Sequence, residues 1–328
     1  MPLPANNTTI VASPAKLNLS LRLLAPRPQD GFTELHSIVA LIDWQDTLSF
    51  TRSEAVLSTG ENSPEVAFTC SVPSLTANPE DNLVVKAVRL FYQQVPFSVL
   101  PSSRRPTQWV VALQKNIPSQ AGLGGGSSNA ASTLRFLRDW HQAKDAVTCY
   151  TLPALQQLGS QLGSDVPLFL AAETPAVVCM TGRGERVTTL PPLALNSLAG
   201  IVCVVVKPKA ISVSTPLAFQ ALHRQQAYSQ VSEMAQLAWL EGLMAGVPLQ
   251  KLTPYLVNEF EPLVWHLEPA LQPLTEKLKS LGAFHALLCG SGSAVVGLFE
   301  IGKEPHHEVL NALFPKADFD WMSVPFLS

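Results

Sequence analysis

Apolar and polar residues alternate between residues 10 and 24, most regularly from Ala15 to Leu23, and this period of two predicts a half-buried β-strand. Leu17 and Leu19 fall on the apolar face of that strand, whereas Lys16 and Asn18 fall on its polar face. Side chains two positions apart in a strand lie about 7 Å from one another, so Lys16 and Asn18 are expected to be neighbours. Because the polar face of a strand is often only solvated, the pattern alone leaves the role of Lys16 open.

Patterns typical of strands and of helices interleave along the chain. Short apolar runs bounded by turn residues predict further strands at residues 38–42, 47–51, 109–113, 176–180, 187–190 and 201–206, and a last one after a glycine and serine turn within 287–299. Apolar residues at helical spacing predict helices at residues 82–92 (with Asp81 as a candidate cap), 130–140, 152–162 and 304–314. Prolines divide the region 215–280 into separate helices. The chain is therefore expected to be an α+β protein of two lobes, with a boundary near residues 165–180.

The glycine-rich segment at residues 121–130 carries the clearest chemical signal. Four glycines lie within five positions, and Ser127, Ser128 and Asn129 follow them as candidate N-caps of the helix expected at 130–140. A glycine loop that leads into a helix directs free backbone N–H groups and the positive end of the helix dipole at an anion, so the segment predicts a phosphate site. A flexible linker of the same composition is the alternative, but linkers seldom lead directly into an amphipathic helix.

This loop differs from the two familiar phosphate-binding loops. A Walker A loop would place a lysine after Gly126, where the chain has Ser127, and a dinucleotide fingerprint would require a third glycine at that same position. No Lys, Arg, Asp or Glu occurs between Asn116 and Leu134. A bound phosphate must therefore be met by backbone amides, hydroxyls, a metal ion or residues from elsewhere in the chain.

The composition narrows the class of protein. The chain has 328 residues, 47% of them hydrophobic and 14% charged, which is typical of a well-folded globular protein with one large or two medium domains. A net charge of −3 argues against a general nucleic-acid binder, although it allows a local basic site for a phosphorylated small molecule. No signal peptide and no membrane-spanning run is evident, so we expect a cytoplasmic protein with neither nucleic acid nor a membrane as partner.

Cysteine and histidine spacing supports neither disulfides nor a metal site. The five cysteines are scattered and never form a CxxC pair; they are Cys70, Cys149, Cys179, Cys203 and Cys289. The adjacent pair His306 and His307 lies in a polar stretch and is predicted to belong to a surface helix.

The order of three motifs resembles the GHMP kinase superfamily. They are the Pro14-Ala-Lys-Leu-Asn-Leu strand, the glycine loop that begins at Ile117-Pro, and the late Gly290-Ser-Gly-Ser293 turn. Within that superfamily the Leu162-Gly-Ser-Asp-Val-Pro167, Asn82-Leu, Gly182-Arg-Gly-Glu185 and Asn258-Glu-Phe-Glu261 segments are similar to kinases that act on a cytidine diphosphate-linked methylerythritol. The resemblance implies an N-terminal lobe like domain 2 of ribosomal protein S5 at residues 1–171 and a ferredoxin-like C-terminal lobe at residues 172–328.

The resemblance also implies a reaction and a set of residues. ATP, with Mg²⁺, would phosphorylate the 2-hydroxyl of the cytidine diphosphate-linked methylerythritol, and the protein would be a monomer or a weak homodimer. Asp165 would take the hydroxyl proton and Lys16 would stabilise charge on the transferred group, although the local pattern of Asp165 also suits a cap for a short helix containing Pro167. The residues implied for ATP are Asn82, Lys115, Pro118, Gly122, Leu123, Gly124, Gly125, Gly126, Ser127 and Ser128. Those implied for the substrate are Asn18, Phe32, Thr33, Phe219, Gly290, Ser291 and Gly292; no residue is assigned to a metal.

One position departs from the pattern of these kinases. They usually carry Asp-Gly-Tyr-His after the first strand, with the aromatic residue stacking on cytosine and the histidine reading its polar edge, whereas this chain has Asp30-Gly-Phe-Thr33. Phe32 keeps a stacking face, but Thr33 is too short to make the histidine's contact, and His36 is a nearby candidate substitute. From the sequence we expect a kinase with a looser preference for cytidine, which Thr33→His would sharpen. The alternatives are a GHMP kinase for another small alcohol, such as homoserine or a sugar, and a non-catalytic nucleotide-binding sensor.

Overall fold

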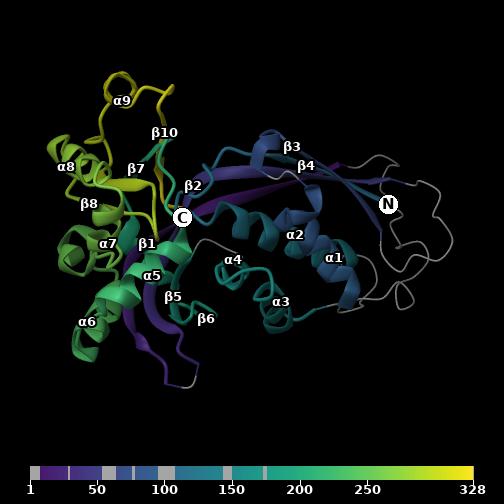
Figure 1. Cartoon of the computed structure of the whole chain (residues 1–328), viewed down its shortest axis with the longest axis horizontal. Coiled ribbons are helices and arrows are strands. Elements are labelled where there is room, and N and C mark those ends of the chain that lie inside the picture. The colour runs from purple at the N-terminus through teal and green to yellow at the C-terminus, as the bar shows by residue number, and fades with distance from the viewer. Residues whose placement is uncertain are drawn as a thin grey trace. The chain divides into compact units, whose positions relative to one another are not determined.

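A computed structural model describes residues 8–28, 30–53, 64–75, 78–94, 108–142, 150–172 and 176–327 (Figure 1). They fall into two compact units that interleave along the chain. Unit 1 comprises Met1–Pro14, Gln45–Ser119 and Gly125–Ala171, and unit 2 comprises Ala15–Trp44, Gln120–Gly124 and Ala172–Ser328. Both units therefore share the long strands β1 (Thr8–Pro26) and β2 (Thr33–Ser53). The lobes expected at 1–171 and 172–328 stay a prediction.

The remaining elements alternate as the sequence pattern predicts. The strands are β3 (Glu65–Cys70), β4 (Gln108–Gln114), β5 (Val177–Gly182), β6 (Arg186–Thr189), β7 (Ile201–Pro208), β8 (His285–Leu288), β9 (Val295–Glu300) and β10 (Phe319–Pro325). The α-helices are α1 (Leu83–Gln94), α2 (Gly125–Gln142), α3 (Leu152–Gly159), α4 (Val166–Ala171), α5 (Thr215–Gln225), α6 (Glu233–Met244), α7 (Glu261–Leu267), α8 (Gln272–Ser280) and α9 (His307–Leu313). Short 3-10 helices are η1 (Pro73–Leu75), η2 (Pro79–Asp81), η5 (Pro192–Leu198) and η6 (Leu249–Tyr255).

Unit 1 packs helices against one face of a sheet. β4 pairs in parallel with β3 and antiparallel with the second half of β2, and α1 and α2 lie side by side beside these strands (Figure 1). Trp109, Val111 and Leu113 of β4 are buried while the residues between them are more open, so only one face of this sheet meets the helices. Phe50 stacks on Phe136 of α2 with ring centroids 4.1 Å apart and anchors that core.

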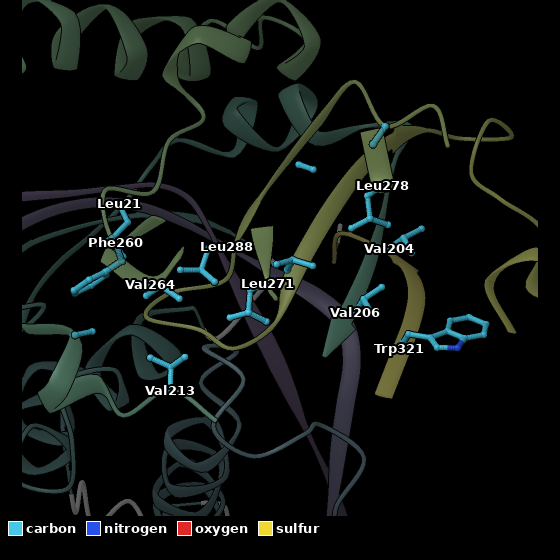
Figure 2. Close-up of a cluster of buried hydrophobic side chains, with 14 of the residues drawn as sticks. Leu21, Val204, Val206, Val213, Phe260, Val264, Leu271, Leu278, Leu288 and Trp321 are labelled. Atoms are coloured by element: carbon cyan, nitrogen blue, oxygen red, sulfur yellow. The ribbon is translucent and has the colours of Figure 1, made fainter. Parts of the chain in front are cut away.

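Unit 2 contains the first half of β2 paired with β5, β6 paired with β5, and a separate four-stranded sheet in the order β10-β7-β9-β8. All eight residues of β7 are buried, because this strand lies inside the sheet and is covered on both faces. Its valines Val204 and Val206 belong to a core that also holds Leu288, Phe260 and Trp321 (Figure 2).

Three boundaries differ from the sequence-based expectation. The segments 38–42 and 47–51 are parts of one continuous strand, β2. The helix expected at 130–140 begins at Gly125, so Ser127, Ser128 and Asn129 lie inside its first turns and are not caps. At α1, Asn82 Oδ1 accepts the Val84 N–H at 2.9 Å, so this capping bond comes from Asn82, one residue after the expected Asp81.

The cysteines, the adjacent histidines and the helix lengths were the remaining sequence-based expectations. Cys70, Cys179, Cys203 and Cys289 are free thiols, and Cys149 lies outside the described residues. His306 and His307 are exposed at the start of α9, as expected. Among the helices that the structure describes, none is both long and apolar enough to cross a membrane.

Candidate active site

Lys16 is held in a buried polar network on β1 of unit 2. Its Nζ donates to Asn18 Oδ1 at 2.7 Å, and Asn18 Nδ2 in turn donates to Ser37 Oγ at 2.8 Å. Ser37 Oγ donates to the carbonyl oxygen of Ser20 at 2.6 Å. Lys16 is only 5% exposed and Asn18 only 7%, so this polar face of the strand is covered and not solvated. The predicted proximity of Lys16 and Asn18 is confirmed, and the network fixes the position of the ammonium group.

The first half of the glycine loop, Gln120–Gly124, packs against the Gly290–Ser293 turn within unit 2. The Ser293 N–H donates to the Gln120 carbonyl at 3.0 Å, and the Ala294 N–H donates to the Ala121 carbonyl at 3.3 Å. A Cβ built on Gly122, whose φ is +74°, would lie 1.7 Å from the Cys289 carbonyl oxygen. Glycine is therefore required at position 122 for both its conformation and its close approach.

The same turn also approaches the ammonium group of Lys16. A Cβ on Gly290 would lie 3.3 Å from Lys16 Nζ, and the Lys16 N–H donates to the Leu123 carbonyl at 3.0 Å. Ser291 Oγ is 2.7 Å from Thr215 Oγ1 at the start of α5. The segments 15–19, 120–124 and 290–293, which are far apart in sequence, thus meet in unit 2.

Two side chains of the Asn258-Glu-Phe-Glu261 segment hold that turn in place. Asn258 Nδ2 donates to the carbonyl oxygens of Leu288 and Gly290, at 2.8 and 2.7 Å. Glu261 Oε1 accepts the Leu288 N–H at 2.8 Å. Burial raises the pKa of the Glu261 carboxyl above its usual range, although the Leu288 N–H and the charge of Lys279 oppose that shift. The turn is therefore held in place by the buried amide of Asn258 and the partly buried carboxyl group of Glu261.

Burial also makes the cysteine of this turn unreactive. Cys289 is 1% exposed, and burial raises the pKa of its thiol to about 12 despite the nearby Lys16 charge. The thiol stays protonated at neutral pH, so Cys289 is a packing residue beside the loop.

The second half of the glycine loop forms the N-terminus of α2 in unit 1. Gly125 begins the helix, Gly126 is exposed, and Ser127 is half-buried with its Oγ 3.7 Å from the position of a Cβ on Gly163. Ser128 is fully buried and its Oγ accepts from Ser13 Oγ at 2.9 Å, which ties the helix to β1. The free N–H groups and the positive end of the dipole of this 18-residue helix therefore lie at the glycine loop, which is the arrangement that binds phosphate at a helix N-terminus.

A buried ion pair anchors the strand that leads into the loop. Asp46 on β2 is completely buried and accepts hydrogen bonds from Lys115 Nζ and from the N–H groups of Asn116 and Ile117, the latter two at 2.7 and 2.8 Å. A Cβ on Gly125 would lie 2.9 Å from Lys115 Nζ and 3.1 Å from Ile117 Cγ2. Lys115 therefore lies against the first residue of α2, and its charge is matched by Asp46.

The other predicted residues of unit 1 occupy element ends. Asp165 is partly exposed and immediately precedes α4, and Asn82 immediately precedes α1. Pro118 lies between β4 and the loop. Each of these residues thus lies at the start of a helix or in the segment that leads into the glycine loop.

The residues expected to hold a cytosine lie at the start of β2 and on α5 in unit 2, with Phe32 immediately before β2. The Phe32 ring is half exposed, and the Arg183 guanidinium lies 4.7 Å from its centroid. Thr33 is 7% exposed, and its Oγ1 lies 3.4 Å from His223 Nε2 of α5. Phe219, on the same helix, packs edge-on against Phe260 with centroids 5.0 Å apart. The structure therefore brings Thr33 and the helix of Phe219 together.

His36 is less available for reading a base. It is 8% exposed, and its Nε2 lies 3.6 Å from Cys179 Sγ. Burial and the charge of Arg22 lower the pKa of its imidazole, which keeps the ring neutral.

Sequence reasoning missed the roles of Asp46 and His223. Asp46 alternates with Leu48 and Phe50 along the strand, and a carboxylate on the same strand face as these apolar residues is the signal that could have drawn attention to it. His223 carries no such signal, because its contact to Thr33 joins segments 190 residues apart.

The described residues contain no group of three or more His, Cys, Asp or Glu side chains arranged to hold a metal ion.

Comparison with known proteins identifies the family. Residues 82–173 match the model for the GHMP kinases N terminal domain, and residues 221–316 match the model for the GHMP kinases C terminal domain. A 4-diphosphocytidyl-2-C-methyl-D-erythritol kinase from Solibacter usitatus is 35% identical over 87% of this chain and 79% of the relative. The kinase of the same name from Protochlamydia amoebophila is 34% identical over 86% of this chain and 81% of the relative. The chain belongs to the 4-diphosphocytidyl-2-C-methyl-D-erythritol kinase family.

A solved structure supports the same family. A crystal structure of 4-(cytidine 5'-diphospho)-2C-methyl-D-erythritol kinase superposes with a TM-score of 0.70 and 27% identity, over 98% of this chain and all of that chain. The α+β GHMP kinase fold predicted from the sequence is confirmed for this member of the kinase family, as is the resemblance on which the site residues were chosen.

Proposed function

We propose that the protein transfers the γ-phosphoryl group of ATP to the 2-hydroxyl of 4-diphosphocytidyl-2-C-methyl-D-erythritol. The family to which the chain belongs supports the reaction, because the relatives that it matches over most of their length are named as this kinase. The observation that carries the proposal to particular residues is the buried Lys16 network beside the docked glycine loop. Phosphoryl transfer depends on alignment and charge neutralisation, and this arrangement is suited to both.

Lys16 and Asp165 are the proposed catalytic pair. Asp165 accepts the proton of the acceptor hydroxyl, and the Lys16 ammonium stabilises the negative charge that develops on the transferring group. Asn18 positions Lys16 by accepting its hydrogen bond, and Ser37 positions Asn18 in turn. The buried setting of Lys16 strengthens its electrostatic effect relative to that of an exposed lysine.

The proposed ATP site uses the backbone of the glycine loop and the first turn of α2. The residues are Pro118, Gly122, Leu123, Gly124, Gly125, Gly126, Ser127 and Ser128, with Asn82 and Lys115 toward the adenine end. ATP supplies the phosphoryl group, and Mg²⁺, bound mainly through the phosphates, would neutralise part of their charge. The chain's own contribution is to aim N–H groups and hydroxyls at the phosphates.

The acceptor site is proposed on unit 2. Phe32 and Phe219 supply aromatic faces for the cytosine, and Thr33 lies beside them on β2. The turn of Gly290, Ser291 and Gly292, which contacts Thr215 at the start of α5, is proposed to support the acceptor in the same unit. One face of Phe32 is already covered by Arg183, so the base would stack on the other face.

The cellular setting follows from the reaction class. The proposed place of the reaction is the non-mevalonate route to isoprenoid precursors, in the cytoplasm, and the proposed assembly is a monomer or a weak homodimer. A shifted acceptor, another small alcohol, is the second candidate function, and the Thr33 departure is the observation that favours it.

Replacing Asp165 tests the proposed mechanism. Asp165→Asn keeps the size and capping ability of the side chain but removes the base, so turnover of ATP with the cytidine-linked acceptor should fall by roughly 10² or more while folding stays intact. Asp81→Asn is the matched control, because Asp81 is an exposed aspartate of the same unit, and it should leave turnover unchanged. Near-normal turnover of the Asp165→Asn protein would rule out Asp165 as the base.

A further inference from the structure

The contact between Thr33 and His223 places an imidazole where the chain lacks the expected histidine. Thr33 occupies the position at which related kinases carry a base-reading histidine, and His223 Nε2 lies 3.4 Å from Thr33 Oγ1. This separation exceeds the usual range for an N–H···O hydrogen bond, so the two groups are only weakly satisfied by one another. A ligand with polar edge atoms could therefore bond to both.

We propose that His223, carried by α5, is the specificity-determining residue that reads the polar edge of the cytosine together with Thr33. This inference rests on the proposed function and deepens it, because it assigns the selectivity of the acceptor site to a residue outside the matching motif. The imidazole comes from α5 and not from β2. The shorter Thr33 side chain leaves open the space on β2 that a histidine at position 33 would fill.

The orientation of the His223 ring is set from its far side. His223 Nδ1 lies 2.9 Å from the hydroxyl oxygen of Tyr228, which follows α5 in the chain, and the two rings meet at an angle of 61°. When the Tyr228 hydroxyl donates to Nδ1, the proton of the neutral imidazole resides on Nε2, the nitrogen that faces Thr33. Tyr228 thus acts as a positioning residue that fixes both the ring angle and the donor.

The spacing of residues on α5 places the His223 imidazole on the same side of the helix as the Phe219 ring. Phe219 and His223 are four positions apart on the helix, so their side chains lie on the same face, one turn apart. Phe32 immediately precedes Thr33 on β2. A base stacked on these aromatic rings would therefore present its edge to the Thr33–His223 pair.

The chemistry of the two pyrimidines explains how the pair would discriminate. N3 of cytosine accepts a hydrogen bond, whereas N3 of uracil carries a hydrogen and repels a donor. An Nε2–H donor of His223 opposite N3 is thus satisfied by cytosine and left unpaired by uracil. The Thr33 hydroxyl can donate to cytosine or accept from uracil, so the discrimination is assigned to His223. The sequence alone predicts a loose preference for cytidine, while the position of His223 leads us to expect that the preference is retained.

The experiment compares kcat/KM for the cytidine and uridine diphosphate-linked forms of the acceptor. His223→Phe keeps an aromatic side chain but removes both ring nitrogens, and His223 is exposed, so the fold should tolerate the change. We expect the parent to favour the cytidine form, and the ratio to fall by about tenfold in His223→Phe through KM, with kcat for the cytidine form nearly unchanged. Tyr228→Phe should give a smaller loss in the same direction.

Matched controls separate this role from a structural one. His266→Phe changes an exposed histidine of α7 in the same unit and should leave the ratio unchanged. An unchanged ratio in His223→Phe, an absence of preference in the parent, or loss of preference only in His36→Gln would overturn the inference while leaving the kinase activity in place. If the parent phosphorylates neither acceptor, the proposed function itself fails. Measurement of the parent alone therefore separates that outcome from a failure of the inference about His223.

Discussion

At the scale of single residues, buried charges determine how the site is held. Asp46 has no exposed surface and satisfies three donors, two of them backbone N–H groups at the exit of β4. The Lys115 side chain is 8% exposed, so its ammonium depends on Asp46 for its charge partner. Breaking a buried pair by neutralising one member costs far more than removing both members together.

Asp46→Asn should therefore lower the free energy of unfolding by about 3 kcal/mol, because it leaves the Lys115 ammonium buried without a countercharge. The double variant Asp46→Asn with Lys115→Met should recover at least half of that loss. Denaturant unfolding of the parent, both single variants and the double variant measures these differences. Additive losses in the double variant would show that the pair is not coupled.

Glu261 gives a stability change that depends on pH. Burial raises its pKa in the folded protein above the ordinary value of 4.5, so its contribution to stability is fully present below that value and is lost as pH rises through the raised pKa. Glu261→Gln keeps an oxygen that accepts the Leu288 N–H and carries no charge. The variant should thus be at least as stable as the parent at neutral pH and should lose this advantage near pH 4.5.

Thermal unfolding of both proteins across this pH range is the measurement, with Glu276→Gln, an exposed glutamate of α8, as the control. A stability difference between parent and Glu261→Gln that does not vary with pH would contradict the assignment of a raised pKa.

At the scale of elements, the glycine loop is two structures joined at one peptide bond. Gln120–Gly124 belongs to unit 2 and Gly125 begins α2 in unit 1. Gly122 and Gly124 have φ values of +74° and +71°, which favour glycine, whereas Gly125 is helical and is restricted by Lys115 and Ile117 instead. Gly122 and Gly124 are thus required for their backbone conformation, whereas Gly125 is required because a Cβ would crowd its neighbours.

Gly122→Ala should displace the loop from the Gly290–Ser293 turn, because its Cβ would overlap the Cys289 carbonyl oxygen at 1.7 Å. We expect a loss of ATP affinity of about tenfold or more together with reduced stability. Gly302→Ala is the control, since Gly302 also has a positive φ, of +82°, but a Cβ there meets nothing within 4 Å and the residue lies outside the proposed ATP site. Isothermal titration with ATP compares the two, and equal affinity in both variants would show that the loop does not hold the nucleotide.

The elements with strong local patterns could be predicted from the sequence, and the exceptions have physical causes. Alternation predicted β1, and an unbroken apolar run predicted β7. The start of α2 could not be predicted, because glycine has low helix propensity and the first turn at Gly125 is held by tertiary contacts. The site residues Asp46 and His223 were missed for a similar reason, since their partners lie far away in the sequence.

At the scale of the whole molecule, the proposed catalytic machinery is divided between the two units. Lys16 belongs to unit 2 and Asp165 to unit 1. If both act on one hydroxyl in one step, their effects on rate cannot be independent. Lys16→Met and Asp165→Asn should each lower kcat by roughly 10² or more, and the double variant should be little slower than the slower single variant. Multiplied effects in the double variant would show that the residues act in separate steps.

The identity of the product tests whether the protein transfers a phosphoryl group from ATP to the 2-hydroxyl of the acceptor. The purified protein would be incubated with ATP, Mg²⁺ and the cytidine diphosphate-linked methylerythritol, and the product examined by phosphorus and carbon NMR. We expect one new monophosphate ester on the carbon that bears the 2-hydroxyl, formed in equal amount with ADP and dependent on the acceptor. ADP formed without the acceptor, or phosphate carried on any other hydroxyl, would contradict this expectation.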